Sequence, residues 1–353
     1  MKILIVTQYF WPENFRINDL VEEFSGYGHE VTILTGIPNY PKGKVFPEFL
    51  SDPDLFNEFN SSRVIRVPII PRGKSKFTLA LNYLSYVISS IIIGSWKLRA
   101  NKFDVIFVYE PSPVTVGFSA IWFKKLKKAP VIFWTLDLWP ESLSAVGIVK
   151  SKTILSFIEK IVGFIYNRCD LILAQSYSFI SQIHKYCKDD VRIEYFPSWS
   201  EELPSSNEIA SEVEFNSNTF DILFTGNIGE AQDFPAIIDA VECLRNENVR
   251  WLIVGGGRMN NWLKDEIINR GLEYQVILPG EFPVERMTSF YNHSQALLVS
   301  LKHDYYLSLV IPAKVQSYLM SGLPILGMVQ GEAEQVIKNS GCGYTCEPGN
   351  GIA

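Results

Sequence analysis

The sequence Phe220-Asp221-Ile222-Leu223-Phe224-Thr225-Gly226-Asn227-Ile228-Gly229 is an apolar run of strand length that ends in a glycine-rich turn. On both sides of it, short apolar runs alternate with amphipathic segments of helical period, which predicts parallel sheets covered by helices. The stretch before it, residues 197–218, is polar, acidic and rich in turn residues, as linkers are. The chain is therefore expected to form two α/β domains, and this run begins the second.

The alternation predicts a definite series of elements. In the first half, strands are expected at 2–7, 30–34, 104–108, 130–135, 170–174 and 191–195, with helices at 15–27, 77–99, 114–128, 152–167 and 177–187. In the second half, strands are expected at 220–225, 250–254, 274–278, 295–300 and 324–327, with helices at 233–246, 259–270, 284–291 and 312–321. A chain of 353 residues, 47% of them hydrophobic, can fill two cores. We predict two tandem doubly wound, Rossmann-like domains with a cleft between them, at 1–200 and 219–353, joined by a linker at 201–218.

Composition narrows the setting in which the protein works. The apolar run at residues 2–7 is too short for a secretory signal, so we expect the protein inside the cell. Its five cysteines lack the spacing of a zinc site or a disulfide framework, and free thiols are expected. The net charge of −6 is unevenly divided, because residues 1–200 carry 23 basic and 18 acidic residues while residues 201–353 carry 9 and 20. The two halves are therefore expected to face different partners.

The region from residue 63 to 128 is especially basic. Such a region attracts anionic lipid head groups or other polyanions, whereas nucleic acid is not expected because no aromatic platform motif is present. We expect a cytoplasmic protein in peripheral contact with anionic lipid on the inner face of the cytoplasmic membrane. The basic residues are Arg63, Arg66, Arg72, Lys74, Lys76, Lys97, Arg99, Lys102 and the run Lys124-Lys125-Leu126-Lys127-Lys128, against Asp104 and Glu110.

Within this region no charged residue occurs between Phe77 and Trp96. The length would allow a helix to span a membrane. One side of that helix is polar, however, and a segment with so many hydroxyl and amide groups is poorly solvated by hydrocarbon. We expect a helix packed in the domain with one side near a membrane surface, with a plain core helix and a span as alternatives. The polar stripe consists of Thr78, Asn82, Ser85 and Ser89.

Two glycine-rich turns follow strands of the second half, where ligands of doubly wound sheets bind. They are Gly226-Asn227-Ile228-Gly229 and Gly255-Gly256-Gly257-Arg258. At such turns the backbone can approach a ligand closely. Each turn alone is also compatible with a tight corner, and Arg258 with a solvated helix residue.

A third feature of this half is the stretch Ile311-Pro312-Ala313-Lys314, which continues to Ser321-Gly322-Leu323-Pro324. It predicts a helix that starts at a proline and carries a lysine in its first turn. The free N–H groups and the dipole of such a helix end favour an anion. Pro312 and Gly322 are also the ordinary start and stop signals of any helix. Together with the glycine turns, this stretch predicts a ligand with a diphosphate at one edge of the second domain.

The predicted strand ends of the first half combine acidic residues with tryptophan, tyrosine and proline. Aromatic faces pack on sugar C–H groups and carboxylates accept hydroxyl protons, so these loops are typical of a site for a polar ligand or carbohydrate. The alternative is that they are proline-stiffened loops whose acids cap helices. The loops are Gln8-Tyr9-Phe10-Trp11-Pro12-Glu13-Asn14-Phe15-Arg16, Tyr109-Glu110-Pro111-Ser112-Pro113 and Asp137-Leu138-Trp139-Pro140-Glu141.

Several chemistries have no motif in this sequence. There is no HExxH or GxSxG motif and no Cys/His nucleophile arrangement, and the four histidines have no metal-ligand spacing. The pair Asp52-Pro53-Asp54 lies in a polar loop, and we expect it to be solvated.

Six of these motifs, in this order along the chain, resemble family 4 glycosyltransferases, and within them the L-fucosamine-transferase-like enzymes of bacterial O-antigen and capsule clusters. The resemblance runs from Met1 to about Pro348 and is specific for the family rather than for the sugar. The motifs are Gln8–Glu13, Gly36-Ile37-Pro38-Asn39-Tyr40-Pro41, Tyr109–Pro113, Asp137-Leu138-Trp139-Pro140-Glu141-Ser142-Leu143, Gly226–Gly229 and Ile311-Pro312-Ala313-Lys314-Val315-Gln316-Ser317-Tyr318.

The resemblance implies a GT-B fold and sugar transfer with retention, without a metal or cofactor, from a nucleotide-sugar donor, UDP-linked in our expectation, to a polyprenyl-diphosphate-linked acceptor. Lys314 would stabilise the leaving diphosphate, while Asp137 and Glu141 would orient hydroxyl groups. The implied donor-binding residues are Gly226, Asn227, Gly229, Gly256, Arg258, Glu281, Pro283, Lys302, Pro312 and Ser317. The implied acceptor-binding residues are Glu13, Arg16, Tyr109 and Glu110.

The sequence departs from the family pattern in two respects. The family's Glu-x₇-Glu pair is replaced by Leu309 and Ser317, and the Arg and Lys common after the first glycine turn are absent, so Lys314 would carry more of the phosphate charge, with Lys302. Family members also continue past the position of Ala353 into helices, the last of which crosses back onto the first domain. We therefore expect C-terminal helices to be missing here. Alternative functions are a sugar-nucleotide 2-epimerase and a truncated, inactive nucleotide-sugar-binding protein.

Overall fold

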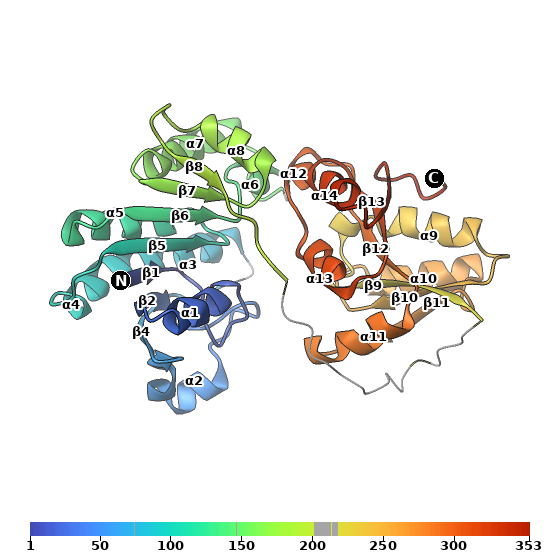
Figure 1. The fold of residues 1–353 in the computed structure, drawn as a ribbon, viewed down its shortest axis with the longest axis horizontal. Coiled ribbons are helices and arrows are strands. Elements are labelled where there is room, and N and C mark those ends of the chain that lie inside the picture. The colour runs from blue at the N-terminus through green and yellow to red at the C-terminus, as the bar shows by residue number, and fades with distance from the viewer. Residues whose placement is uncertain (74, 146, 201–212, 214–217) are drawn as a thin grey trace. The chain divides into compact units, whose positions relative to one another are not determined.

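The computed structural model describes residues 1–353 except 74, 146, 201–212 and 214–217. The chain divides into two compact units, Met1–Pro197 and Ser198–Ala353, which are unit 1 and unit 2 below. Each unit contains a largely parallel sheet with helices packed on it (Figure 1). The predicted tandem Rossmann-like fold is confirmed. Apart from Val213 and Asn218, the predicted linker lies outside the described residues.

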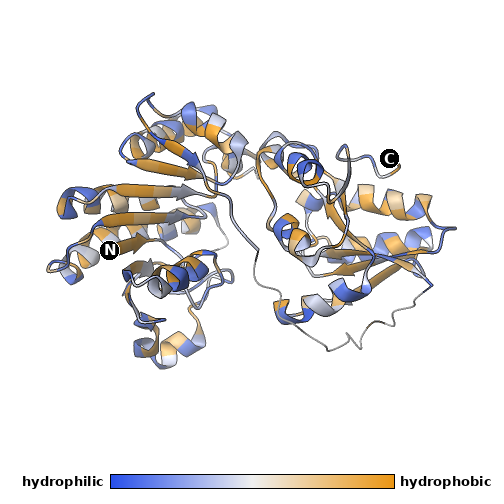
Figure 2. Cartoon of the chain, in the orientation of Figure 1, coloured by the Kyte–Doolittle hydropathy of each residue, from blue (hydrophilic) through white to orange (hydrophobic). Residues whose placement is uncertain are grey.

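The sheet of unit 1 has eight strands in the order β3-β4-β2-β1-β5-β6-β7-β8, all parallel except for the pair β3–β4. The inner strands are largely buried, and Figure 2 colours β5, β6 and β7 largely orange. In chain order the elements are β1 (Lys2–Val6), α1 (Ile17–Gly26), β2 (Glu30–Gly36), α2 (Pro47–Ser51), β3 (Glu58–Phe59), β4 (Ser62–Val67), α3 (Lys76–Ser89), the π-helical segment η2 (Ser90–Gly94), α4 (Ser95–Lys97), β5 (Val105–Glu110), α5 (Val116–Lys127), β6 (Val131–Thr135), α6 (Glu141–Ala145), α7 (Lys152–Tyr166), β7 (Leu171–Ala174), α8 (Tyr177–His184) and β8 (Ile193–Tyr195).

Strand β4 was not predicted, because its two arginines interrupt the apolar pattern. It pairs in parallel with β2, and Arg66 on it is 7% exposed. The guanidinium of Arg66 donates hydrogen bonds to the carbonyl oxygens of Phe56, Gly36 and Trp11, and burial lowers its pKa to about 10. Arg66 therefore joins three loops from inside and does not belong to the exposed basic region in which the sequence analysis included it.

The long uncharged helix, formed by α3, η2 and α4, has its polar side turned toward the protein interior. Asn82 is fully buried, accepts a hydrogen bond from Gln8 (2.7 Å) and donates one to the carbonyl of Ile70 (2.6 Å). The hydroxyls of Ser90 and Ser119 on α5 lie 2.6 Å apart. The opposite side is apolar and exposed at Phe77, Leu84, Ile88, Ile92 and Trp96.

Residues 76–97 form a helix that is long and apolar enough to cross a membrane, and 33% of it is buried within the protein. In the described part of the chain it is the one helix with this property. Polar groups on this side of the helix form hydrogen bonds within unit 1. The polar stripe therefore does not have to face water. The stripe anchors the helix to unit 1 and leaves an apolar face outside.

The sheet of unit 2 has six parallel strands in the order β11-β10-β9-β12-β13-β14, and one apolar core lies on each of its faces. The pair α14 and β14 lies beyond the last predicted strand, at 324–327, and was not predicted. The elements are β9 (Phe220–Thr225), α9 (Phe234–Cys243), β10 (Val249–Val254), α10 (Asn260–Arg270), β11 (Val276–Gly280), α11 (Met287–His293), β12 (Ala296–Ser300), α12 (Tyr305–Leu309), α13 (Ala313–Ser321), β13 (Ile325–Met328), α14 (Glu332–Ser340) and β14 (Gly343–Cys346).

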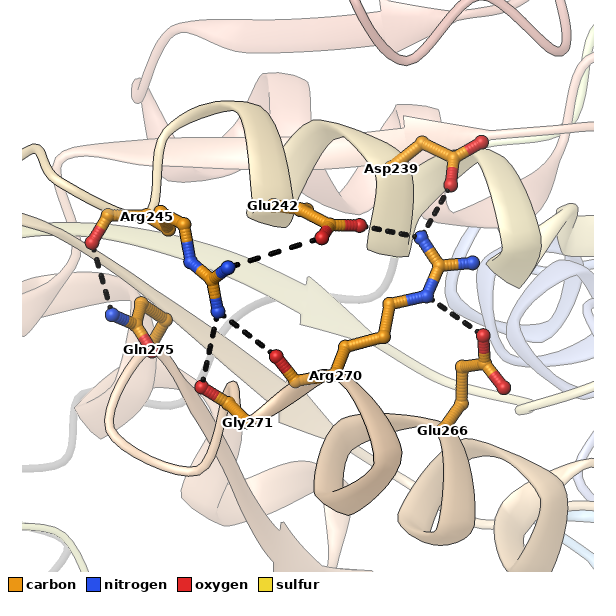
Figure 3. Close-up of polar contacts among 7 residues, drawn as sticks. All are labelled: Asp239, Glu242, Arg245, Glu266, Arg270, Gly271 and Gln275. Atoms are coloured by element: carbon orange, nitrogen blue, oxygen red, sulfur yellow. Dashed lines mark hydrogen bonds and ion pairs between the residues drawn. The ribbon is translucent and has the colours of Figure 1, made fainter.

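Two groups of ion pairs stabilise this unit in different surroundings. On the surface, Arg270 at the end of α10 binds Asp239 and Glu242 of α9 and also Glu266 (Figure 3). In the interior, Arg250 on β10 donates two hydrogen bonds to Asp221 on β9, at 2.8 and 2.6 Å. The Asp221 side chain is 2% exposed, whereas that of Arg270 is 27% exposed. Removing one partner of the buried pair should therefore cost more stability than removing one of the surface group, because water cannot replace the missing partner.

Replacing Arg250 with alanine is expected to cost about 3 kcal/mol of unfolding free energy, because it leaves a buried carboxylate without its cation. Arg270→Ala is expected to cost about 1 kcal/mol or less, since its partners remain solvated. Urea unfolding of both variants, followed by fluorescence, measures the difference. Equal losses would contradict the distinction between the two groups.

Candidate functional site

Several of the predicted donor-binding residues come together at the carboxyl edge of the unit 2 sheet. The strand order runs outward in both directions from β9 and β12, so the point where the order reverses lies between these two strands. Open α/β sheets bind ligands at such a point. The turn after β9 begins at Gly226, and Lys314 lies on the helix α13 that follows β12 along the chain.

The two glycine-rich turns contact each other at this edge. A side chain on Gly255 would begin 1.9 Å from the carbonyl oxygen of Gly226, and both glycines have positive φ, at 145° and 118°. The amide of Ile228 donates to the carbonyl of Gly256 (2.8 Å). The glycines are therefore required by backbone contact between the turns. Because the turns support each other, the exposed backbone at Gly226 and Asn227 is held in place without a ligand.

Helix α13 packs against the end of β9 through two side chains one turn apart. The hydroxyl of Tyr318 accepts a hydrogen bond from the amide of Thr225 (2.8 Å). One turn earlier, the Lys314 Nζ atom lies 3.7 Å from the centroid of the Phe224 ring. A Cβ atom on Gly226 would lie 3.8 Å from that nitrogen, so the ammonium group points at the first glycine turn.

The Lys314 ammonium has no hydrogen-bond partner among the described residues, and its nitrogen is buried although other atoms of the residue are partly exposed. Burial lowers the pKa of Lys314 to about 7. A buried cation is unfavourable unless an anion pairs with it, and the aromatic ring offsets only part of that cost. The start of α13, capped by Pro312, adds free N–H groups. The arrangement is therefore suited to a phosphate or diphosphate that contacts both the glycine turn and the lysine.

The remaining predicted donor residues lie at different places on this edge. The Lys302 amide donates to the carbonyl of Ala231, just beyond the first glycine turn, and the Glu281 side chain lies against Gly256. Ser317 is partly exposed on α13. Gly229 is buried at the end of its turn, while Arg258 and Pro283 are exposed.

The predicted acceptor residues lie at the equivalent edge of the unit 1 sheet, where the strand order reverses between β1 and β5. The loops at this edge come from β1, β2, β5 and β6. Each contains one cis X-Pro peptide bond, at Trp11-Pro12, Tyr40-Pro41, Ser112-Pro113 and Trp139-Pro140.

Glu13 does not face a ligand in this structure, which corrects the prediction that it binds the acceptor. It is 3% exposed, and its carboxylate accepts hydrogen bonds from the amides of Phe10, Asn39 and Tyr40 at 3.1, 2.8 and 2.7 Å. Burial raises its pKa to about 7, against the opposing effect of these amides. Glu13 therefore fixes the loops after β1 and β2 to each other.

Tyr109 and Glu110 are also buried, contrary to their predicted display to an acceptor. The Tyr109 ring packs on that of Trp134, with centroids 5.3 Å apart. Glu110 is fully buried, and neither of its oxygens makes a hydrogen bond of ordinary geometry. Burial and, next, the neighbouring charge of Asp137 raise the pKa of the Glu110 carboxyl well above its usual range.

Asp137, Glu141 and Arg16 lie closer to the surface of this edge. One Asp137 oxygen accepts a hydrogen bond from the Trp139 indole (3.2 Å). One Glu141 oxygen accepts from the hydroxyl of Tyr186 (2.7 Å), and the other is buried without a partner. Arg16 is partly exposed and pairs with Asp19 (3.4 Å). Of the predicted set in unit 1, Asp137, Glu141 and Arg16 are the residues that are partly exposed.

Three residues at this edge were not among the predicted site residues. The guanidinium of Arg72 lies over the Tyr40 ring, 5.5 Å from its centroid. It also contacts the hydroxyl of Tyr9 and lies near that of Tyr83, which faces Ser112. Tyr9 was part of a noted motif, whereas Arg72 was counted only as one of many basic residues. The available signal was its position, three residues before Ser75, the N-cap of the uncharged helix.

Among the described residues no group of three or more His, Cys, Asp and Glu side chains could hold a metal ion. The expectation that transfer needs no metal or cofactor stays a prediction.

Comparison with known proteins identifies both units. Residues 14–199 match the glycosyl transferase 4-like domain, and residues 205–353 match the glycosyl transferases group 1. These matches cover most of the chain and favour sugar transfer over the epimerase alternative.

Two relatives are bacterial proteins that are named as glycosyltransferases. One is WcaI of Escherichia coli strain K12, named as a colanic acid biosynthesis glycosyl transferase, with 26% identity over 296 residues, 79% of this chain and 72% of the relative. Another is the glycosyltransferase WbjE of Pseudomonas aeruginosa, with 23% identity over 271 residues, 72% of this chain and 65% of the relative. The aligned region thus leaves about a third of these relatives unmatched.

Among solved structures, Anabaena HepE in complex with UDP and glucose aligns with 99% of this chain and 87% of its own, with a TM-score of 0.65 and 14% identity. At this identity the likeness shows the fold alone, and HepE has the GT-B fold that the sequence analysis predicted.

Replacing Lys314 with methionine is expected to stabilise unit 2. The folded-state pKa of about 7 lies below the unfolded value of 10.5, so below pH 7 the buried amine opposes folding most strongly. The gain should be roughly 2–5 kcal/mol at pH 6–7 and should shrink as pH rises toward 10.5. Urea unfolding at several pH values measures it. Lys264→Met, at an exposed position of α10, is the matched control and should change stability little. A loss of stability in Lys314→Met would contradict the geometry described.

Proposed function

Since this chain belongs to the glycosyltransferases, with a 4-like domain at residues 14–199 and a group 1 domain at residues 205–353, we propose that it moves a sugar from a nucleotide-sugar donor to a lipid-linked acceptor in the synthesis of a bacterial surface polysaccharide. The observation that carries this proposal is the buried ammonium of Lys314, which lies beside the first glycine turn and has no hydrogen-bond partner in the described part of the chain. The fold holds this cation beside Gly226 and Phe224 without an anion next to it among the described residues. A nucleoside diphosphate supplies that anion and carries a sugar at its far end.

In this proposal unit 2 binds the donor, and the nucleoside of the donor is uridine. The diphosphate lies between Lys314 and the amides after Gly226, with Lys302 nearby. When the bond from the sugar to the β-phosphate breaks, negative charge grows on the leaving oxygen, and a fixed cation lowers the barrier. That HepE was solved with UDP and glucose supports this choice of nucleotide.

The chemical step forms a bond from the acceptor oxygen to the anomeric carbon as the bond to the leaving phosphate breaks. We propose that attack occurs on the face from which the phosphate departs, which gives retention, and that the leaving phosphate takes the acceptor proton. No strong protein base is then needed, and Asp137 and Glu141 orient acceptor hydroxyls. The six ordered motifs resemble the L-fucosamine-transferase-like subgroup, so N-acetyl-L-fucosamine or a related amino or deoxy sugar is the proposed group.

We further propose that unit 1 rests on the inner face of the cytoplasmic membrane, where a lipid-linked acceptor is held. The support is the outward apolar face of the helix at residues 76–97, which continues at Trp122 and Leu126 on α5. The side chains of Trp122 and Ser95 are joined by a hydrogen bond of 2.8 Å, so these helices are neighbours. The basic residues Lys97 and Lys125 are exposed on the same helices, and Arg99 is exposed in the turn after α4. Apolar residues with lysine and arginine at their margins are typical of helices that lie in a lipid interface.

The transfer reaction is tested by incubating the chain with UDP-sugars and a polyprenyl-diphosphate-linked saccharide. UDP should be released only when both are present, and NMR of the product should show the anomeric configuration of the donor. Lys314→Ala should lower kcat/KM by about 100-fold or more, because it removes the cation that stabilises the leaving group. Lys264→Ala should leave it unchanged. Release of UDP without acceptor, or an inverted product, would sink the corresponding part of the proposal.

Membrane contact is tested by sedimentation with vesicles that contain phosphatidylglycerol. The double variant Ile88→Asp, Ile92→Asp should bind at least about tenfold more weakly, since two apolar side chains no longer enter the interface. Ile268→Asp on α10, which is equally exposed at 62%, is the matched control and should bind as the parent does. If the double variant binds normally, a different surface makes the contact.

A further inference from the structure

The surroundings of Arg72 suggest a second anion site, in unit 1. The backbone amide of Arg72 donates to the side-chain oxygen of Asn39 (2.9 Å), and a side chain on Gly43 would collide with the Arg72 carbonyl at 1.9 Å. The guanidinium lies over the ring of Tyr40. The backbone is thus fixed by the loop after β2, and the partly exposed side chain extends along an aromatic surface.

The groups around the guanidinium are neutral. The guanidinium bonds to the hydroxyl of Tyr9 and lies near that of Tyr83, and burial raises the pKa of both hydroxyls, so they remain protonated at neutral pH. No carboxylate in the described part of the chain forms an ion pair with Arg72. Arg66, the other arginine near this edge, differs because its guanidinium donates hydrogen bonds to three carbonyl groups inside the fold. Arg72 is therefore a permanent cation beside two hydroxyl donors, without an acceptor that neutralises it.

This combination matches an oxyanion with several charges. A guanidinium binds phosphate through two parallel N–H groups, and hydroxyl donors bind the remaining oxygens. A sugar hydroxyl alone would leave the charge uncompensated. The chemical class indicated is a phosphate or diphosphate.

The location of Arg72 indicates which phosphate. It precedes by five residues Phe77, which is 72% exposed at the start of the apolar helix face. Its neighbour Tyr83 faces Ser112 and Asp137, and the Tyr83 ring lies 6.0 Å from that of Trp139. Arg72 is thus close along the chain to the face proposed to meet lipid and, through Tyr83, close in space to the carboxylate proposed to orient the acceptor sugar. A lipid-linked saccharide has its phosphates at the same position, between lipid and sugar.

We propose that Arg72, with the hydroxyls of Tyr9 and Tyr83, binds the diphosphate of the lipid-linked acceptor. This inference rests on the proposed function, because it assigns a residue to the acceptor named there. It separates the two cations by role. Lys314 binds the diphosphate of the donor, and Arg72 binds that of the acceptor.

The test is calorimetric titration of the full chain with farnesyl diphosphate, with UDP present at saturation so that the Lys314 site is filled. Arg72→Ala should weaken binding by about 10- to 100-fold, since it removes charge-assisted hydrogen bonds, and Arg72→Lys should restore part of it. Arg63→Ala, which removes an exposed arginine of β4, is the matched control and should have no effect. The UDP affinity and the melting temperature of each variant show whether it is folded.

Two further titrations identify the source of the phosphate. Farnesol, which has the lipid without the charge, should bind at least tenfold more weakly than farnesyl diphosphate. If inorganic pyrophosphate binds as tightly as farnesyl diphosphate, the site takes a free phosphate compound and the lipid assignment is overturned. If Arg72→Ala binds farnesyl diphosphate as the parent does, the whole inference is overturned. Arg72-dependent binding by a chain that fails to transfer sugar would uphold this site and refute the proposed function, so the two are separable.

Discussion

The contact between the Lys314 ammonium and the end of β9 is the constraint on which the rest of unit 2 depends. The amine can reach Gly226 only because the Tyr318 hydroxyl, one turn later, accepts a hydrogen bond from Thr225 and holds α13 in register with the strand. Two glycine turns that contact each other fix the backbone beside the amine. The fold thus buries the Lys314 ammonium without a partner among the described residues, which costs stability. Such costs are common where a site is formed for a charged ligand.

Unit 1 solves a different problem with the same sheet architecture. Its loops contain several acidic and aromatic residues, but buried ones such as Glu13 and Tyr109 fix loops or fill the core. The residues that remain accessible are fewer, and they include Asp137, Glu141 and Arg72. The long helix at residues 76–97 has two different sides. Asn82 joins one side to the loop after β1, while apolar residues on the other side face outward.

Much of this could be predicted from the sequence, because strands and helices of doubly wound domains have strong periodic signals. The two-domain fold and the glycine turns followed from such signals. Strand β4 was missed because Arg66 looks like a surface residue, and only the three carbonyl groups brought to it by distant loops make it a buried one. Glu13 was assigned to a ligand for the same reason, since its amide partners at Asn39 and Tyr40 are distant in sequence. Residue type predicted the chemistry, and tertiary contacts determined which residues remain available for it.

The most direct test of the central claim is an NMR titration of the Lys314 side chain, with selectively labelled lysine, in the free chain and in the chain saturated with UDP. The account predicts a pKa near 7 in the free chain, because the buried amine lacks an anion. It predicts a rise of at least about two units when UDP is bound, because a phosphate then lies beside the amine. An ordinary lysine pKa in the free chain, or the same value with and without UDP, would contradict the account.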